Sequence, residues 1–497
     1  MKGFGDNKRS KEHISNKQDF KPIKENLIKL AFKYHLKGEK YNEAKCYEYF
    51  IKQGYSDYRV FNNYGAILKS IRKYKEAELY TRKALELKPN YPNAYYNLGC
   101  IYIDIKKLKE AELYTRKALA LKADFFDANY NLGFILRDLG KLEESEKYLL
   151  KTIKLNSECA KAYMILSTLN YSRDKAIWIE KLFSKSLLIG KTNLEKVDIY
   201  FARANILHKE AKFKLSAENL SLANNIKLKI SPSNADKFIA KSRNIMKVSP
   251  LKELKKQRSS IVLENIFIVG MFRSGSTLIE SILSTNNIVK DLGEVNFLEG
   301  SYEELNNISK TKTDLTLNDI YLKKIRHLNK KARVFTNKWL DNYIYTGIIV
   351  NQISNTKIIH CIRNPLDNIL SIYRAHFAGG SEYSSSLVDS TKIYLNQKWL
   401  MKEYKSKYSS YIYELNYENL VSDPEKEIKT LISWLGWDWD DSYLEPHLNK
   451  RVVSTRSNVE VRSPINSNSI GGWRNYKDML KPAIDILKQN NEYQELI

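Results

Sequence analysis

The chain has 497 residues, of which 43% are hydrophobic, and it carries a formal net charge of +25. This length leaves room for two or three domains that each bury a core, and the hydrophobic content excludes a chain that is disordered throughout. The excess of lysine and arginine favours acidic partners such as nucleotides, acidic peptides, anionic glycans or nucleic acid, although a solvated coat of lysines would give the same charge.

The cysteines and the apolar runs indicate the cellular compartment in which the protein is expected to lie. Cys46, Cys100, Cys159 and Cys361 are far apart, which gives no disulfide framework and no paired metal motif and favours a reducing, cytoplasmic location. No run of 18 or more apolar residues and no signal-peptide core occurs, so we expect no membrane contact. Residues 1–23 are polar and basic, which predicts a disordered tail.

A motif with a period of 34 residues follows the tail. Asn-Tyr-Gly or Asn-Leu-Gly recurs at 63–65, 97–99 and 131–133, and small residues recur with the same step. This is the tetratricopeptide period, in which small residues let two antiparallel helices approach closely. We therefore predict an array of about six repeats over 24–229. Such an array binds a protein or peptide along its concave face, or serves only as a spacer.

The stretch 230–260 contains two Ser-Pro pairs and a dense run of cations. It is predicted to form a capping helix and a linker. A second domain is expected to begin near Ile261 and to cover 261–497.

The apolar run at 266–269 predicts a strand buried on both faces, and a helix is predicted to begin near Ser276. Between them, the loop 270–275 has the glycine spacing of a phosphate-binding loop, but serine replaces its lysine and the only cation is Arg273. Neither that lysine nor an acidic magnesium support is found, so the loop does not match an ordinary nucleoside triphosphatase. A group with less charge at its transferred end, such as a 5′-phosphosulfate, needs no metal.

The loop offers several donors to an anion. Backbone N–H groups at the helix start are backed by the positive end of the helix dipole. Arg273 can bind an oxyanion through two parallel hydrogen bonds. The other cofactor-binding candidates here are Ser274, Gly275, Ser276 and Thr277.

This stretch resembles sulfotransferases that use 3′-phosphoadenosine 5′-phosphosulfate, in particular the tyrosylprotein sulfotransferases, whose loop reads close to VGMPRSGTTLLE. Phe272 replaces the family proline. The resemblance covers about residues 264–482 through four motifs in the family's order. It implies a P-loop-like α/β domain with a central parallel sheet, helices on both faces, and the nucleotide at the carboxyl ends of the strands.

The resemblance also implies a catalytic base. A Gly-Glu pair ends at Glu294, 21 residues beyond Arg273, which is the family distance between base and loop arginine. A carboxylate can take the proton of an acceptor hydroxyl as that hydroxyl attacks sulfur. Glu280, Asp291 and Glu299 are rival carboxylates. Of these, Glu280 is expected to serve the packing or the solvent face of the helix after the loop.

Two further strand ends carry candidates through the resemblance. Lys338 ends a strand predicted over 332–338, where the family has a lysine that faces the leaving group. Arg363 follows the next predicted strand, and its pairing with Ser371 matches the family's 3′-phosphate site. His360 lies inside that strand and is expected to be a core residue, although other sulfotransferases use a histidine base.

The carboxyl-terminal part supplies the last candidates. Tyr417 stands in a segment similar to the family's YExL, where the tyrosine contacts the nucleotide, and Glu418 is expected to be structural. Ser457 begins a segment similar to the family's SxxQVRxPI loop, which covers the nucleotide, but Glu460 replaces the glutamine. Trp473 is expected to pack or to stack, with packing favoured.

Together these features predict a tetratricopeptide solenoid fused to a sulfotransferase domain. The resemblance implies transfer from 3′-phosphoadenosine 5′-phosphosulfate to a protein tyrosine, with Glu294 as base and with Arg273 and Lys338 neutralising the leaving group. A glycan or small-molecule acceptor, a nucleoside or small-molecule kinase, and an inactive scaffold are the alternatives. We expect no metal, and neither a membrane nor nucleic acid as partner.

Overall fold

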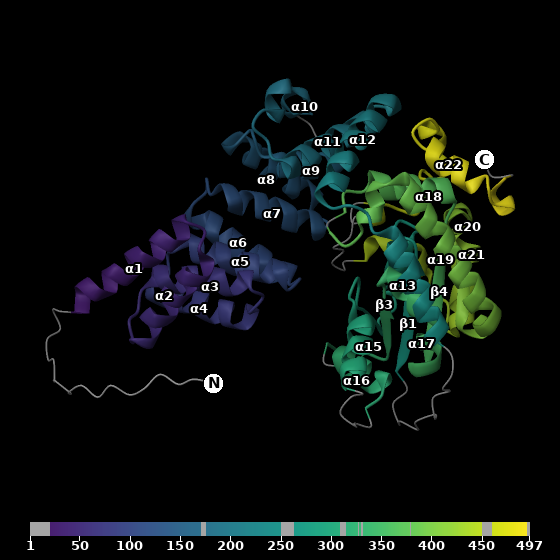
Figure 1. Ribbon diagram of the computed structural model, residues 1–497, viewed down its shortest axis with the longest axis horizontal. Coiled ribbons are helices and arrows are strands. Elements are labelled where there is room, and N and C mark those ends of the chain that lie inside the picture. Colours follow the sequence, from purple (N-terminus) through teal and green to yellow (C-terminus); the bar gives the residue numbers. More distant parts are fainter. Residues whose placement is uncertain are drawn as a thin grey trace. The chain divides into compact units, whose positions relative to one another are not determined.

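The computed structural model describes residues 20–169, 175–249, 263–308, 315–326, 328–329, 332–377, 379–449 and 460–494 (Figure 1). The chain divides into two compact units, Met1–Ile135 and Leu136–Ile497. Within the described residues the first unit is helical, and the second holds further helices and a parallel sheet. The first helix begins at Phe20, inside the stretch predicted as a tail, and the residues before it lie outside the described ones.

Antiparallel helix pairs build the first unit, and small residues allow the two helices of a pair to touch. A Cβ added at Gly65 would lie 2.4 Å from Thr81 Oγ1, and one added at Gly99 would lie 2.5 Å from Thr115 Oγ1. These glycines belong to the predicted 34-residue motif, so the helical repeat is confirmed. The helices are α1 Phe20–Leu36, α2 Lys40–Lys52, α3 Tyr58–Ser70, α4 Tyr74–Leu87, α5 Pro92–Asp104, α6 Leu108–Leu121 and α7 Phe126–Asp138, whose last turn passes into the second unit.

The second unit begins with more helices. Ser216 on one helix of the α11–α12 pair donates to the Ala204 carbonyl on the other at 2.8 Å, again through a small buried residue. The last of them, α13, falls in the stretch predicted as capping helix and linker, whose remainder from residue 250 lies outside the described residues. They are α8 Leu142–Leu155, α9 Ala160–Thr168, α10 Lys175–Phe183, the 3-10 helix η1 Lys185–Leu188, α11 Asn193–Lys209, α12 Phe213–Ile230 and α13 Ala235–Val248.

A five-stranded parallel sheet of order β2-β3-β1-β4-β5 forms the centre of the second unit. The three strands predicted from the sequence, at 266–269, at 332–338 and before Arg363, are confirmed as β1, β3 and β4, with ends that differ by up to two residues. The edge strand β2 was not predicted, because three half-buried residues give no pattern. The strands are β1 Glu264–Gly270, β2 Val289–Asp291, β3 Val334–Asn337, β4 Thr356–Ile362 and β5 Ile412–Asn416.

Alternate residues of β1 enter two separate cores. Phe267 and Val269 pack with residues of α13, α16, α17 and α19, whereas Ile266 and Ile268 pack with residues of α14 and α21. A strand buried on both faces reads as an uninterrupted apolar run, which explains why it was recognisable. The predicted α/β fold with helices on both faces of a parallel sheet is therefore confirmed.

The remaining helices connect and cover these strands. The α-helices are α14 Ser276–Leu283, α15 Phe297–Ile308, α16 Leu317–Arg326, α17 Thr346–Gln352, α18 Pro365–Arg374, α19 Leu387–Tyr408, α20 Tyr417–Ser422, α21 Pro424–Leu435 and α22 Lys481–Leu487. The 3-10 helices are η3 Leu340–Tyr345, η4 Glu382–Ser385, η5 Ser409–Tyr411, η6 Asp441–Leu444, η7 Pro446–Leu448, η8 Glu460–Arg462, η9 Gly472–Tyr476 and η10 Asn491–Tyr493.

The α11–α12 pair packs on the sheet-containing part of its own unit. Asn224 and Lys227 on α12 donate to the carbonyls of Tyr373 and Phe377 at 2.9 and 3.2 Å. These carbonyls lie at and just after the end of α18, which starts at the sheet. The helical pair therefore helps to fix the segment that follows α18.

Among the described residues, no helix is long and apolar enough to cross a membrane. All four cysteines carry free thiols. Burial raises the pKa of each thiol above its ordinary value, and that of Cys361 to about 12, so the thiols stay protonated at neutral pH.

Replacing Gly99 by alanine tests the close approach of α5 and α6. The added methyl group would press on Thr115 Oγ1, so we expect the free energy of unfolding to fall by about 1–3 kcal/mol, measured by urea denaturation. The Gly99→Ala/Thr115→Ala double variant, which lacks the obstructing hydroxyl, should recover most of this loss. A Gly99→Ala protein as stable as its parent would contradict the packing described.

Candidate active site

The loop 270–275 turns directly from β1 into α14. Gly270 has a φ of +140°, and a Cβ there would lie 2.6 Å from the Cys361 carbonyl oxygen of the neighbouring strand β4. Gly275 has a φ of +89°, and a Cβ there would lie 2.5 Å from the Tyr417 ring. Both positions therefore require glycine, for conformation and for space. The Ser274 hydroxyl donates to the Met271 carbonyl at 2.7 Å, within the loop itself.

Arg273 is the cation of this loop and adopts a left-handed backbone with a φ of +66°. Residues other than glycine rarely adopt this left-handed backbone conformation, and those that do are enriched at functional sites. Its Nε donates to Ser371 Oγ of α18 at 2.9 Å, and its Nη2 pairs with the carboxylate of Glu460, a side chain that is 60% exposed. In the structure, Ser371 is thus hydrogen-bonded to Arg273.

Arg363 follows β4 and reaches the same loop. Its Nη1 donates to the Arg273 carbonyl at 2.9 Å, its Nη2 donates to the Ser469 carbonyl at 2.7 Å, and its guanidinium lies 4.6 Å from the centre of the Tyr417 ring. The buried Nε has no hydrogen-bond partner among the described residues. Burial lowers the pKa of Arg363, and the charge of nearby Arg273 acts in the same direction. An anion would relieve both the missing bond and the repulsion.

Other polar side chains accept hydrogen bonds from the backbone around these arginines. The Asp367 carboxylate accepts from the backbone N–H groups of Gly471 and Trp473 at 2.6 and 2.9 Å, and Trp473 is buried, as expected for a packing residue. Glu418 accepts from the Asn364 N–H at 2.9 Å, which gives it the expected structural position. Ser457, the remaining nucleotide-binding candidate, lies outside the described residues.

Lys338 follows β3 and is completely buried, although lysine is rarely buried without partners. Its Nζ lies 2.8 Å from Glu294 Oε1 and 4.0 Å from Glu280 Oε2. The Glu294 side chain is 36% exposed, so its carboxylate can be reached from solvent. The two predicted catalytic groups, Lys338 and Glu294, therefore form one ion pair at the carboxyl ends of the strands.

Glu280 was assigned to packing or solvent from the sequence, but its carboxylate lies in this site. It is 1% exposed and accepts from the Gly293 N–H at 3.2 Å. A signal was available in the sequence: Glu280 lies four residues after Ser276, so both project from the same face of α14. Of the other rivals, Asp291 ends β2, and Glu299 pairs with Lys241 of α13.

His360 is confirmed as a core residue. It is buried in β4, with Nε2 at 2.6 Å from Gln397 Nε2 and Nδ1 at 3.5 Å from Glu414 Oε1. Burial lowers its pKa, although Glu414 opposes this effect, and neutral imidazole is therefore favoured at pH 7.

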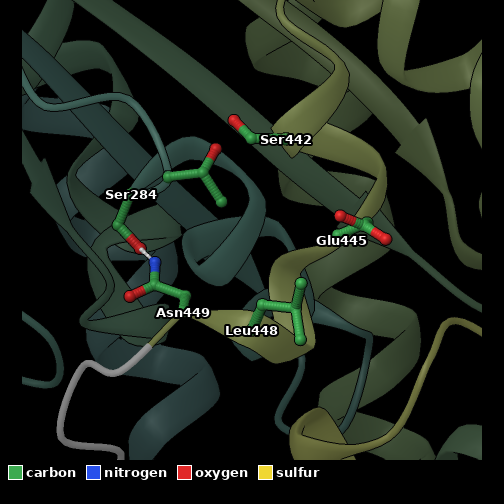
Figure 2. A pocket seen from close by; sticks show the side chains of 6 residues that line it. Ser284, Ser442, Glu445, Leu448 and Asn449 are labelled. Atoms are coloured by element: carbon green, nitrogen blue, oxygen red, sulfur yellow. Dashed lines mark hydrogen bonds between the residues drawn. The ribbon is translucent and has the colours of Figure 1, made fainter.

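A polar pocket lies at the other end of α14 (Figure 2). In it, Asn449 Nδ2 donates to Ser284 Oγ at 3.0 Å. The eight residues of α14 separate this pocket from the loop by about 12 Å along the helix axis, so it is distinct from the site at the strand ends. Its lining consists of Ser284, Thr285, Ser442, Glu445, Leu448 and Asn449. Within the described residues, no group of three or more His, Cys, Asp or Glu side chains is arranged to hold a metal.

Comparisons with known proteins agree with this architecture. Residues 265–441 match a model described as the sulfotransferase family, and tetratricopeptide repeat models match 58–91, 80–112 and 126–159. An uncharacterized protein of Aquifex aeolicus (strain VF5) is 30% identical over 244 residues, which are 45% of this chain and 32% of that protein. The chain thus spans about a third of this relative's length.

Solved structures include a similar protein for each part. The sulfotransferase domain of the Synechococcus PCC 7002 olefin synthase is 17% identical and covers 47% of this chain and 98% of its own, with a TM-score of 0.34. The tetratricopeptide protein YrrB is 22% identical and covers 38% of this chain and 95% of its own, with a TM-score of 0.29. By its family matches, the chain joins tetratricopeptide repeats to a sulfotransferase family domain.

Proposed function

We propose that this protein transfers a sulfuryl group from 3′-phosphoadenosine 5′-phosphosulfate to the hydroxyl of a protein tyrosine. The observation that carries the proposal is the ion pair between the buried Lys338 and the partly exposed Glu294, at the end of a strand next to the one that leads into a loop whose one cation is Arg273. The strands β1 and β3 that lead into these two features are hydrogen-bonded neighbours. A cationic loop and an accessible carboxylate therefore lie at the carboxyl ends of neighbouring strands, which supports the assignment of an anion site and a base there.

The residues at the loop fit a nucleotide with two anionic ends. Arg273, the backbone amides of 270–275 and the first turn of α14 would hold the 5′-phosphosulfate. Ser276 and Thr277 belong to that first turn, whereas the Ser274 hydroxyl already donates within the loop and would contribute its backbone N–H instead.

We assign the second anionic end of the nucleotide, the 3′-phosphate, to Arg363. Its buried and unpartnered Nε supports a role in binding the 3′-phosphate. Ser371 would act there by orienting Arg273, with which it is hydrogen-bonded. The Tyr417 ring, against both Gly275 and Arg363, would border the nucleotide.

In the reaction, the acceptor oxygen forms a bond to sulfur while the bond from sulfur to the 5′-phosphate oxygen breaks. Glu294 would take the acceptor proton, because its carboxylate is accessible and is held by Lys338. The departing adenosine 3′,5′-bisphosphate gains negative charge, which the ammonium of Lys338 and the guanidinium of Arg273 would offset. Lys338 is shielded from water, so its charge acts more strongly than it would at the surface.

A phenol suits this base better than an aliphatic alcohol. A tyrosine hydroxyl has a pKa of about 10 and gives up its proton more readily than a sugar hydroxyl. His360, the histidine that the sequence offered as an alternative base, lies inside β4 and is buried in the core. Tetratricopeptide repeats bind proteins and peptides in general, so we propose that the repeats bring the protein acceptor to the enzyme.

The Glu294→Gln variant tests the base. We expect transfer of ³⁵S-labelled sulfate to a tyrosine peptide to fall about 100-fold or more, because glutamine cannot accept the proton. Binding of adenosine 3′,5′-bisphosphate should change little. The exposed carboxylate Glu303 on α15 provides the control variant Glu303→Gln, which should be fully active. Activity of Glu294→Gln equal to that of the parent would reject Glu294 as base.

The acceptor class is tested with matched peptides and a glycan. A tyrosine peptide should be labelled by the parent enzyme, whereas its phenylalanine twin and a glycosaminoglycan should not. Labelling of the glycan alone would contradict the tyrosine assignment and leave the sulfuryl-transfer assignment standing.

The Arg363→Ala variant tests the 3′-phosphate site. Loss of the bond to the Arg273 carbonyl should weaken the binding of both nucleotides, and loss of the charge-assisted bond to the 3′-phosphate should weaken adenosine 3′,5′-bisphosphate roughly 10-fold more than adenosine 5′-phosphate. Calorimetric titration measures both, and Arg326→Ala on the exposed face of α16 is the control. An equal loss for the two nucleotides would remove Arg363 from this role.

A further inference from the structure

We propose that Glu280 is a positioning residue of this active site, which keeps the charge of Lys338 compensated while Glu294 is protonated during transfer. The catalytic effect of Glu280 rests on the proposed function, whereas the contacts of Glu280 that motivate the proposal do not depend on it. Glu280 itself is 1% exposed and is therefore closed to an acceptor. It acts through Lys338 and Glu294.

The carboxylate of Glu280 links three parts of the site. It lies on α14, one turn beyond the loop, and its Oε1 accepts from the Gly293 N–H at 3.2 Å and lies 3.5 Å from Thr336 Oγ1 on β3. Gly293 in turn accepts at its carbonyl from the Lys338 N–H at 3.1 Å. The turn that presents Glu294 is thus fixed by Glu280 on one side and by the end of β3 on the other.

Lys338 is close to two carboxylates that differ in their distance from it and in their exposure to solvent. Its Nζ is 2.8 Å from Glu294 and 4.0 Å from Glu280, and only Glu294 is partly exposed. The Cys361 thiol also lies near Lys338, and burial raises its pKa to about 12, so it remains neutral. Among the described residues, the carboxylates within 4.0 Å of this buried ammonium are those of the two glutamates.

The proposed reaction changes the charge around Lys338 when the acceptor proton is transferred. When Glu294 accepts the acceptor proton, its charge is lost, and a buried ammonium without a partner is strongly unfavourable. Glu280 is shielded from the acceptor and therefore does not take up this proton. It would therefore keep Lys338 compensated while the ammonium also faces the leaving group, and the acceptor proton can move to Glu294 without leaving Lys338 unpaired.

A double-mutant cycle on stability tests the charge coupling without any substrate. The full-length variants Glu280→Gln, Lys338→Met and Glu280→Gln/Lys338→Met are compared with the parent by scanning calorimetry. Glutamine keeps an acceptor oxygen for the Gly293 N–H, so mainly the charge is removed. We expect Glu280→Gln to lower the Tm of the parent by roughly 3–6 °C and to change the Tm of the Lys338→Met protein by less than about half as much, because the ion pair between Glu280 and Lys338 is already lost there.

The difference between the effects in the two backgrounds is the decisive result. If Glu280→Gln lowers the Tm equally in both backgrounds, or changes neither, Glu280 is not coupled to Lys338 and the proposal is overturned. The control Glu304→Gln, which removes an exposed ion pair with Lys324 on the neighbouring helix, should leave the Tm unchanged in both backgrounds.

The catalytic part is tested by a kinetic split. Glu280→Gln should lower kcat about 10-fold while the KM for 3′-phosphoadenosine 5′-phosphosulfate stays within about twofold, because Glu280 is buried and acts through Lys338 and Glu294 on the transition state. An unchanged kcat would refute the positioning role. A parent protein without sulfuryl-transfer activity would refute the proposed function, whereas the stability cycle would still decide the Glu280–Lys338 coupling.

Discussion

The hydrogen bond from Arg363 to the carbonyl of Arg273 is the contact on which the rest of this site depends. It ties the end of β4 to the loop that follows β1, where Gly270 already lies against the Cys361 carbonyl. Without a glycine at that point the two strand ends could not approach. Two guanidinium groups are thereby held together in a partly buried place, and their mutual repulsion favours an anion between them.

A second balance of charges operates at the end of β3. Lys338 is fully buried and is compensated by one accessible and one inaccessible glutamate. The arrangement separates two tasks that a single carboxylate could not perform together. In the proposed reaction Glu294 would take up a proton, while Glu280 would keep Lys338 compensated and fix the turn that carries Glu294.

The sequence predicted most of this architecture for physical reasons. β1 is apolar on both faces, and the glycine spacing of the loop is set by steric limits, so both features are visible locally. Lys338 and Glu294 were identified only through resemblance, because an ion pair between residues 44 positions apart depends on the fold. Glu280 was missed as a site residue for the same reason, and β2 was missed because it is short and half-buried.

The central claim, that the loop binds a 3′-phosphorylated nucleotide without a metal, is tested most directly by calorimetric titration of the full chain with adenosine 3′,5′-bisphosphate and with ATP in the presence of a chelator. We predict that the bisphosphate binds at least about 10-fold more tightly than ATP, a difference of about 1.4 kcal/mol. Tighter binding of ATP, or ATP binding that appears only when Mg²⁺ is added, would contradict the account and favour a phosphoryl-transfer enzyme.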